Sequence, residues 1–281
     1  MAVDVPSLKL SEQSFYILRE LFERECGIHL HTDKKMLVVS RLQRRLELRH
    51  LQGFEDYCAL LKQPAEAEER QWMVDALTTH ETFFFRAPNQ FQHLTRHALP
   101  MLAHRPLRIW SAAASTGEEA YSLAMTLAET LGAAGWELLG SDISGRAVWH
   151  AARGLYPLSR LEEMPKEYLK KYCRKGLGEY AGQLLVNRSL RARTQFFRHN
   201  LLDSAAKIGS FDVIFLRNVL IYFDPPRRRQ ILRNMLARLR PGGYLYIGHS
   251  ESASDELVEL ESVGHSAWRS KQTNDMQRMA P

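Results

Sequence analysis

Cysteine is scarce in this sequence, and long apolar runs are missing. The three cysteines among 281 residues, Cys26, Cys58 and Cys173, are an odd and scattered set without metal-ligand spacing. We therefore expect free thiols in a reducing compartment, with no disulfide framework and no metal site. No apolar run approaches the ~18 residues of a membrane span, and the first ten residues lack the pattern of a secretion signal. These absences predict a cytoplasmic protein that inserts no segment into a membrane.

Neither positive nor negative charge is in large excess in this chain. Apolar residues make up 45% of the chain and charged residues 25%, as is typical of a soluble protein with a sizeable core. The net charge of +6 is small for this length, so it permits acidic partners without indicating nucleic acid. At 281 residues the chain is long enough for two domains.

Strand-like alternation is absent from the first 85 residues, which we predict to be an all-helical domain. Ser11 can cap a helix that Gly27 ends. Thr32 or Asp33 can cap a second helix, residues 34–50. The apolar spacing predicts two more helices in this domain, near residues 54–61 and 66–78.

The pattern changes in the remaining domain, assigned to residues 86–281. Short apolar runs, WELLGSD, FDVIFLRN and GYLYIGHS, alternate with helical stretches. Strands that alternate with helices predict an α/β fold with a mostly parallel sheet. The segment GLGEYAGQLLV, residues 176–186, has three glycines followed by a β-prone run, and we expect a small β-hairpin insertion at about 176–198.

The most informative stretch is LRIWSAAASTGEEAY, residues 107–121. A short strand that turns through small residues into a helix lets a ligand approach the backbone at the strand's carboxyl end. Glu118 and Glu119 stand where a phosphate site would have lysine or bare amides. They suit a ligand with hydroxyls, an amine or a positive charge, as in S-adenosylmethionine. Glu118, first after the turn, is the expected ligand, and Glu119 is expected to cap the helix or face solvent.

Polar residues also follow two other predicted strands. Asp142 ends the second strand, where an acid commonly binds ribose hydroxyls; the alternative is a helix N-cap. Arg217 and Asn218 end the strand in FDVIFLRNVLIYF, where ligands bind in such sheets. Tyr222, four residues after Asn218, can also be a core tyrosine with one bonded hydroxyl.

Two segments carry arginines of interest. In THETFFFR, Arg86 follows three phenylalanines, and its planar fork matches a carboxylate; the alternative is a solvated arginine at a helix start. The helix 34–50 has few acids and an unbalanced basic face, which favours docking onto an acidic surface over a simple solvated face. Its basic residues are Lys34, Lys35, Arg41, Arg44, Arg45 and Arg49.

Two further motifs indicate competing functions. Asp224-Pro225-Pro226 resembles the D-P-P-Y signature of methyltransferases that act on bases, but Arg227 replaces the stacking aromatic, and the segment suits a helix start. The segment GHSES, residues 248–252, mimics the G-x-S-x-G elbow of esterases, with Ser in place of the last Gly. A non-catalytic module that senses S-adenosylmethionine or docks a partner is the third alternative.

Taken together, these segments resemble the chemotaxis receptor methyltransferases, the CheR family, over nearly the whole chain to about Arg269. The resemblance rests on several motifs in order: TTHETFFFR, RIWSAAASTGEEAYSLAM, SDIS, FFRHNLLD, RNVLIYFDPPRRRQIL and PGGYLYIGHSES. It implies a Rossmann-like S-adenosylmethionine-dependent methyltransferase domain with a small antiparallel β-subdomain, preceded by an all-helical N-terminal domain.

The resemblance also implies an activity. The family transfers a methyl group from S-adenosylmethionine to glutamate side chains on the cytoplasmic domain of bacterial chemoreceptors. The products are glutamate methyl esters and S-adenosylhomocysteine. The basic helix 34–50 would contact the receptor, and the β-subdomain would hold a receptor's C-terminal tether peptide. No nucleic acid and no membrane insertion are implied.

Site residues follow from the same resemblance. Arg86 and Tyr222 match the residues beside the reacting methyl group, and His80 stands where many relatives have Asn. The implied cofactor-binding residues are His80, Thr82, Arg86, Glu118, Asp142, Asn200, Leu201, Arg217 and Asn218.

Overall fold

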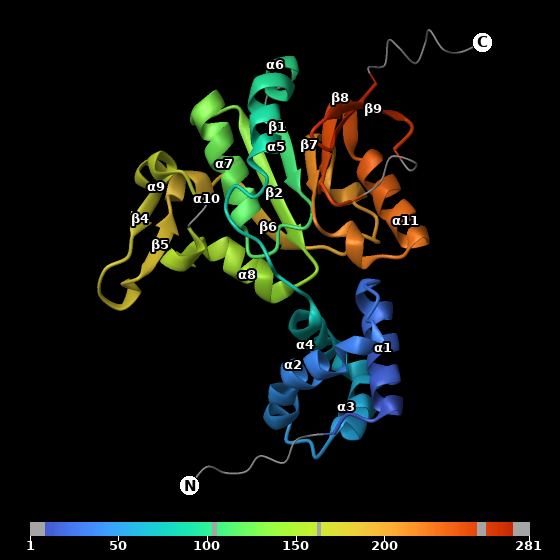
Figure 1. Cartoon of the computed structure of the whole chain (residues 1–281). Helices are drawn as coiled ribbons and strands as arrows, with labels where there is room; N and C mark the ends of the chain where they lie inside the picture. Colours follow the sequence, from blue (N-terminus) through green and yellow to red (C-terminus); the bar gives the residue numbers. More distant parts are fainter. Residues whose placement is uncertain (1–8, 103–105, 162–163, 252–256, 272–281) are drawn as a thin grey trace, which may run out of the picture. The chain divides into compact units, whose positions relative to one another are not determined.

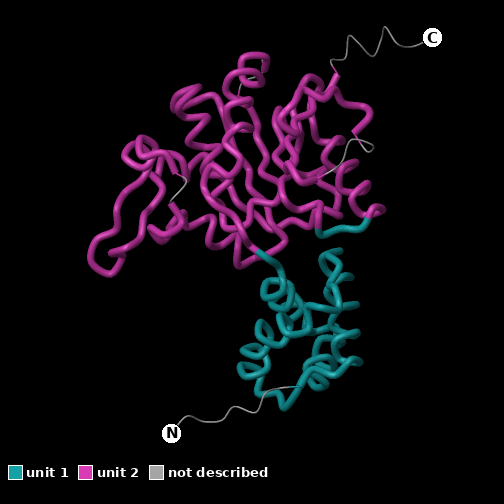
Figure 2. Tube along the Cα trace, in the orientation of Figure 1, with its two compact units in different colours: residues 1–79, 222–224 teal, residues 80–221, 225–281 magenta. Residues whose placement is uncertain are grey.

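The computed structural model describes residues 9–102, 106–161, 164–251 and 257–271. The chain divides into two compact units, which Figure 2 colours separately. Unit 1 comprises residues 1–79 and 222–224, and unit 2 comprises residues 80–221 and 225–281. The division falls between Thr79 and His80, six residues before the boundary expected from the sequence. Among the described residues, the helices include none with both the length and the apolar character needed to cross a membrane.

Unit 1 is helical, as expected. Ser11 caps the first helix by accepting a hydrogen bond from the Ser14 amide at 3.1 Å, and Gly27 ends it with a φ of 77°. The cap expected at Thr32 or Asp33 does not form, because the chain enters the second helix through a 3-10 turn whose N-cap makes no side-chain hydrogen bond. The elements are α1 Glu12–Cys26, η1 Thr32–Lys34, α2 Lys35–Leu48, α3 Phe54–Leu61, η2 Pro64–Glu66 and α4 Ala67–Leu77.

Apolar side chains at helical spacing build the core of unit 1. They are fully or almost fully buried and come from all four α-helices: Phe15, Leu18, Phe22, Val38, Leu42, Leu46, Phe54, Leu61, Met73 and Val74. The segment 222–224 belongs to the same unit, and the amide of His29 donates to the Tyr222 carbonyl oxygen at 3.2 Å.

Unit 2 contains a seven-stranded sheet in the order β6-β2-β1-β7-β8-β10-β9 (Figure 1). Neighbours from β6 to β8 pair in parallel, whereas β10 pairs antiparallel with both β8 and β9. The strands are β1 Leu107–Ser111, β2 Trp136–Asp142, β6 Thr194–Arg198, β7 Phe211–Leu216, β8 Leu239–Ile247, β9 Leu260–Gly264 and β10 Ala267–Ser270. All six residues of β7 are buried, so the core runs through the middle of this sheet.

Helices and short turns connect these strands. The helix α7 follows β1 and is buried along most of its length, which agrees with its alanine-rich and apolar sequence. The helical elements of unit 2 are α5 Pro88–His93, η3 Leu94–Ala98, α6 Leu99–Met101, α7 Glu118–Leu131, α8 Gly145–Arg153, η4 Leu158–Arg160, α9 Lys166–Tyr172, η5 Gly178–Tyr180, α10 Arg188–Arg191, η6 Ala206–Ile208, η7 Leu220–Tyr222 (whose last residue groups with unit 1) and α11 Pro225–Leu236.

A second, three-stranded antiparallel sheet has the order β3-β5-β4, with β3 Leu155–Pro157, β4 Cys173–Lys175 and β5 Gln183–Val186. Its extent differs from the expected 176–198. It begins earlier, because the three-residue strands β3 and β4 are too short to show a pattern. It also ends earlier, because residues 194–198 form β6 and pair with β2 in the large sheet.

The strand order reverses at β1. From β1 the chain builds outward through β2 to β6 on one side, and then returns to build β7 and β8 on the other. Such a reversal is where open α/β sheets have their ligand-binding crevice, at the carboxyl ends of the strands, because the loops on its two sides leave in opposite directions.

Candidate functional site

The loop of small residues after β1, residues 112–117, brings the start of α7 to this crevice. Gly117 has a φ of 97° immediately before the helix. A Cβ atom on it would lie 2.8 Å from both the Ala151 Cβ and the Tyr156 hydroxyl oxygen. Glycine is therefore required at this one position, by conformation and by space. The same Tyr156 hydroxyl donates to the Thr116 carbonyl oxygen at 2.7 Å and holds the turn.

Asp142 joins this loop to the end of β2. One carboxylate oxygen accepts from the Ser115 amide at 2.9 Å, and the other accepts from the Ser144 amide at 3.0 Å. The N-cap of α8 is Ser144, whose hydroxyl accepts from the Ala147 amide at 3.1 Å. Asp142 is thus not the helix cap that the sequence left open, and it lies in the crevice between two strand ends.

Glu118 is 1% exposed at the first position of α7. Its carboxylate accepts from the Thr116 hydroxyl at 2.6 Å. Burial raises the pKa of Glu118, and the bond from Thr116 opposes that rise. A buried carboxylate of this kind is costly without a ligand, as is common at functional sites.

Glu119 differs from the expectation that it would cap the helix or face solvent. Its carboxylate accepts from the Ser111 hydroxyl at 2.8 Å and pairs with the Arg217 guanidinium at 3.2 Å. Burial raises its pKa, and the positive charge of Arg217 acts in the opposite direction. Because only the short loop 112–117 separates β1 from α7, the first turn of the helix points this second acid toward Arg217 at the end of the neighbouring strand β7.

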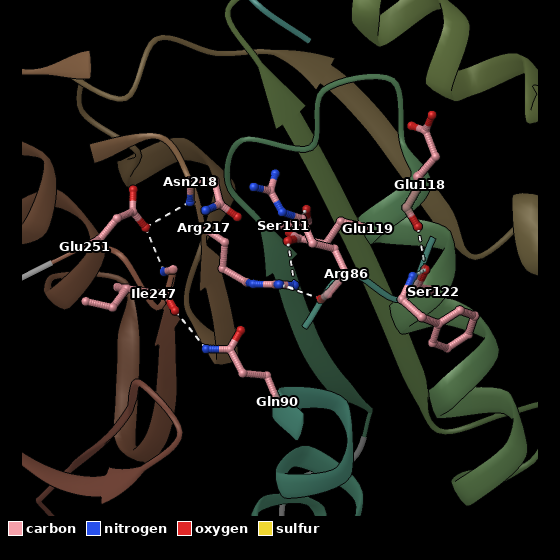
Figure 3. A network of polar contacts seen from close by, with 12 residues as sticks. Arg86, Gln90, Ser111, Glu118, Glu119, Ser122, Arg217, Asn218, Ile247 and Glu251 are labelled. Carbon is pink, nitrogen blue, oxygen red and sulfur yellow. Dashed lines mark hydrogen bonds and ion pairs between the residues drawn. The ribbon is translucent and has the colours of Figure 1, made fainter. Parts of the chain in front are cut away.

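Arg217 links the strand end to the segment that carries Arg86 (Figure 3). Its Nη2 donates to the Arg86 carbonyl oxygen at 2.5 Å, while its Nη1 donates to Glu119. The guanidinium lies over the rings of Phe91 and Phe215 at 5.8 and 5.9 Å. With only 6% exposure, Arg217 uses its planar fork to fix protein groups around the crevice.

The backbone at Arg86 is held in a strained conformation. Phe85 and Ala87, on either side of it, both have a φ of 57°, which costs ~1–3 kcal/mol for each such residue. The Phe85 amide donates to the Ser122 hydroxyl at 2.9 Å, and that hydroxyl donates to the Glu118 carbonyl oxygen at 2.7 Å. The start of α7 therefore positions Arg86 from one side and Arg217 from the other.

The Arg86 side chain is half-buried in unit 2. Its Nη1 donates to the Glu81 carbonyl oxygen at 3.3 Å, and its guanidinium carbon lies 5.6 Å from the centre of the Phe83 ring. It is therefore neither a simple solvated arginine nor part of a helix. Thr82 and His80, both predicted to bind the cofactor, are half-buried in the same segment.

The remaining predicted residues follow β6 and β7. Asn200 closes a turn after β6 by accepting from the Leu202 amide at 3.1 Å, and the Leu201 carbonyl oxygen accepts from Asn234 at 2.9 Å. Asn218, directly after Arg217, has a φ of 56°. Tyr222 groups with unit 1, so its position beside Arg86 stays a prediction.

The structure thus brings together most of the predicted set at the carboxyl ends of four parallel strands of unit 2. These residues are Glu118 after β1, Asp142 at β2, Asn200 and Leu201 after β6, and Arg217 and Asn218 after β7. Sequence reasoning missed Glu119, Ser122 and Glu251 as members of the network. Only the adjacency of Glu119 to Glu118 gave a signal, because each of the three also has a partner far away along the chain: Arg217, Phe85 and Asn218, respectively.

These residues fit S-adenosylmethionine. The buried acids Glu118 and Asp142 suit its hydroxyls and positive charge. In addition, the Ser115 hydroxyl and Nε2 of His199 are buried near the ends of β1 and β6 without a hydrogen-bond partner in the described part of the chain. Such atoms are rare unless a ligand or water satisfies them. Within the described ranges, no group of three or more His, Cys, Asp or Glu side chains is arranged to hold a metal ion.

The basic face of α2 is less available than the sequence suggested. Arg45 forms a two-pronged pair with Glu69 of α4, with distances of 2.9 and 2.5 Å, and Glu69 is 1% exposed. Arg49 pairs with Glu66 at 2.7 Å. Arg41 donates to the carbonyl oxygens of residues 77 and 78 at the end of α4, both at 3.0 Å. These charges balance acids and a helix end within unit 1.

Lys34 pairs with Asp33 at 2.9 Å, and Lys35 pairs with Glu12. Arg44, in contrast, is exposed and makes no hydrogen bond or ion pair with any residue that the structure describes. Of the six basic residues, Arg44 is therefore the one whose charge no group in the described part of the chain balances.

The two competing motifs have structural roles. The D-P-P segment lies at a helix start, since α11 begins at Pro225. In the GHSES segment, Nδ1 of His249 lies 3.1 Å from the Ser266 hydroxyl oxygen. Glu251 of that segment accepts hydrogen bonds from main-chain amides of two loops (Figure 3).

Two family models match the chain in adjacent regions. The model described as the CheR methyltransferase all-alpha domain matches residues 13–78, and the CheR methyltransferase SAM binding domain matches residues 80–268. The two ranges meet at the division between the two units.

Curated relatives match over most of their length. A chemotaxis protein methyltransferase 2 of Pseudomonas aeruginosa is 42% identical over 95% of this chain and 99% of its own. The chemotaxis protein methyltransferase of Salmonella typhimurium is 38% identical over 93% and 91%, and that of Escherichia coli is 39% identical over 88% and 87%. These matches confirm the resemblance, the fold and the cofactor expected from the sequence. The chain therefore belongs to the CheR methyltransferase family, whose S-adenosylmethionine-dependent methylation serves chemotaxis.

Proposed function

We propose that this protein methylates glutamate side chains on the cytoplasmic domain of bacterial chemoreceptors, in the cytoplasm. The products would be glutamate methyl esters, which serve chemotaxis adaptation, and S-adenosylhomocysteine. The observation that supports this most is the crevice itself. It combines two buried acids suited to a cationic cofactor with an arginine, Arg86. Arg217 holds the Arg86 carbonyl oxygen, and Ser122 holds the amide of the preceding residue, Phe85.

Binding of the cofactor would divide among the strand ends. Asp142 would accept from the ribose hydroxyls, and Glu118 would face hydroxyls or the amine. Asn200, Leu201, Arg217 and Asn218 would line the pocket, with His80 and Thr82 on the segment before Arg86. When bound, S-adenosylmethionine supplies a methyl group activated by a positively charged sulfur.

The chemistry would need positioning more than proton transfer. A glutamate side chain has an ordinary pKa of ~4.3, so at neutral pH it is already an anionic nucleophile and requires no general base. Arg86 would hold a carboxylate of the substrate or of the cofactor, and Tyr222 would donate a hydrogen bond that orients the attacking oxygen. Good orientation can supply an effective molarity of ~10⁵ M or more. Arg86 must not bind the nucleophile too tightly, since that also stabilises the ground state.

Two surfaces would engage the receptor. The first is α2, where Arg44 offers the outward charge. The second is a groove of about 380 Å³ beside the edge strand β4, which suits a receptor's C-terminal tether peptide. An extended peptide can add to a strand edge, and arginines can bind its carboxylate. The groove combines basic and apolar residues: Arg153, Leu155, Arg174, Lys175, Leu177, Tyr180, Leu185 and Arg191.

The deciding experiment is transfer of a labelled methyl group to purified receptor cytoplasmic fragments. We expect label that mild base releases as methanol, because glutamate methyl esters are base-labile. Fragments with the receptor glutamates changed to alanine serve as the control. Base-stable label, or label only in added nucleic acid, would contradict the proposal. Cofactor binding without transfer would indicate a sensing module, and ester cleavage without cofactor would indicate the esterase alternative.

A further inference from the structure

Glu251 is a buried acid to which the proposed chemistry assigns no task. It is 6% exposed and lies four residues after the end of β8. One carboxylate oxygen accepts from the Gly248 amide at 2.6 Å and from the Asn218 amide at 2.8 Å. The other accepts from the amides of Val219 and Leu220, both at 2.7 Å. A single side chain therefore satisfies four main-chain donors from the loops that follow β7 and β8.

This arrangement suits a carboxylate and no neutral side chain. An ionised carboxylate has only acceptor sites, and here each oxygen receives two N–H groups. Hydrogen bonds to a charged acceptor are shorter and stronger than those between neutral groups. Three of the four donors are consecutive, at residues 218–220, so their N–H groups converge on one point. Without Glu251 these amides would lose their common partner, in a loop where Asn218 and Val219 are half-buried and Leu220 is buried.

The loop whose amides Glu251 binds, residues 218–220, is also strained at a residue predicted to bind the cofactor. Asn218 has a φ of 56°, a conformation that non-glycine residues adopt at a cost and that the surroundings must enforce. Its amide is one of the four that Glu251 binds. Tyr222 comes two residues after Leu220, the last residue whose amide donates to Glu251.

Gly248 shows how closely these parts pack. A Cβ atom on Gly248 would lie 2.5 Å from Oε2 of Glu251 and 3.0 Å from both the main-chain and side-chain nitrogens of Asn218. The glycine therefore makes room for the carboxylate and for Asn218 together. Gly248 and Glu251, the first and fourth residues of the GHSES segment, thus act together to hold the loop after β7. The likeness of the segment to an esterase elbow is superficial.

We propose that Glu251 is a positioning residue for methyl transfer. Its carboxylate fixes the loop after β7 and thereby sets the Asn218 side chain for the cofactor and the η7 turn that carries Tyr222. Gly248 is also required, because its lack of a side chain leaves room for the Glu251 carboxylate. The inference rests on the roles proposed above for Asn218 and Tyr222.

The test compares Glu251→Gln with Glu251→Asp and with the matched control Glu259→Gln, which removes one charge at an exposed position. In Glu251→Gln an NH₂ group faces two main-chain donors. We expect its affinity for S-adenosylmethionine by calorimetry to fall about tenfold or more, with a lower kcat for receptor fragments. Glu251→Asp keeps the charge and should recover part of both. Gly248→Ala should reproduce the Glu251→Gln defect, and Glu259→Gln should resemble the wild type.

A merely structural role would give a different result. Glu251→Gln would then lower the thermal midpoint, while cofactor affinity and kcat, measured well below that midpoint, would match the wild type. That result overturns the proposal. If Glu251→Gln is unfolded at the assay temperature, the same comparison is made with Glu251→Asp. The calorimetry needs no methyl acceptor, so it decides the role of Glu251 even if receptor glutamates prove not to be the substrate.

Discussion

The Arg217 side chain donates a hydrogen bond to the main-chain carbonyl oxygen of Arg86 at 2.5 Å, across 131 residues of sequence. Two residues that the sequence assigned separately to the cofactor pocket are thus mechanically coupled. The strained segment around Arg86 depends on this bond and on the hydrogen bond that the neighbouring Phe85 amide donates to the Ser122 hydroxyl. Arg86 can therefore be displaced without being mutated.

Replacing Arg217 by lysine should not be conservative. A lysine ammonium is a single point charge and cannot bind both Glu119 and the Arg86 carbonyl oxygen in the fork geometry of a guanidinium. We expect kcat/KM to fall about tenfold to hundredfold, in line with one lost charge-assisted hydrogen bond, with near-native circular dichroism. Steady-state kinetics with receptor fragments make the measurement. Unchanged kinetics would show that the coupling to Arg86 has no role.

Tyr222→Phe should lower turnover and leave cofactor affinity nearly intact. The hydroxyl is proposed to orient the attacking oxygen, so its loss acts on the reaction and not on the binding of the cofactor. We expect kcat to fall about tenfold or more, measured beside calorimetry with S-adenosylhomocysteine. An equal loss in both quantities would remove Tyr222 from the proposed role.

Asp142→Ala should weaken cofactor binding. The change removes the proposed ribose contacts and also frees the Ser115 amide from its partner. We expect the dissociation constant for S-adenosylmethionine to rise about tenfold to hundredfold. The exposed Asp33→Asn serves as the control for loss of one acidic charge. Calorimetry that shows no change for Asp142→Ala would contradict the ribose role.

Glu118→Gln should stabilise the cofactor-free protein at neutral pH. Burial raises the pKa of Glu118 in the folded state, so the folded protein holds this proton more tightly than the unfolded chain does. The free energy of unfolding therefore falls as pH rises from the ordinary glutamate pKa through the raised one. The stability advantage of Glu118→Gln should be present at pH 7, shrink as pH falls through the raised pKa, and be lost below the ordinary value of about pH 4.5. Thermal melts across this range test the sign, while calorimetry should show weaker cofactor binding by the variant.

Arg44→Glu and Arg45→Glu should separate docking from folding. Arg44 is exposed, so its reversal should slow receptor methylation, most at low salt, and leave stability within about 0.5 kcal/mol. Arg45 pairs with the buried Glu69, so its reversal should destabilise the protein by about 3–5 kcal/mol or more. Urea unfolding and methylation rates measure the two effects. Normal methylation by Arg44→Glu would show that this side of α2 is only a solvated face.

Much of the fold could be predicted from local patterns in the sequence. The apolar spacing from Phe15 to Phe22, Ser11 as a cap and Gly27 as a stop all act within one helix. The alternation of strands and helices after Leu107 is likewise local, and so is the turn at Gly117. Features of this kind can be recognised without knowing any distant partner.

Other features could not be read in this way, because they depend on partners far along the chain. The sequence suggested that Glu119 is a surface acid, but in the structure it pairs with Arg217, which follows another strand. Arg45 looked like part of a free basic face until Glu69 of a different helix neutralised it. The acceptor role of Glu251 depends on main-chain amides about thirty residues earlier. Every residue except proline has such an amide, so the sequence cannot show which ones a side chain will bind.

The grouping of residues 222–224 with the helical unit also bears on how this protein can be dissected in the laboratory. A fragment that stops at residue 79 would lack these three residues, and its His29 amide would lose the carbonyl oxygen of Tyr222. A fragment that begins at residue 80 would keep them but leave behind the helices with which they group. A single cut after residue 79 therefore leaves the first half without part of unit 1, while the second half carries unit 2 together with three residues of the other unit. Stability measured on the first half would report on an incomplete unit.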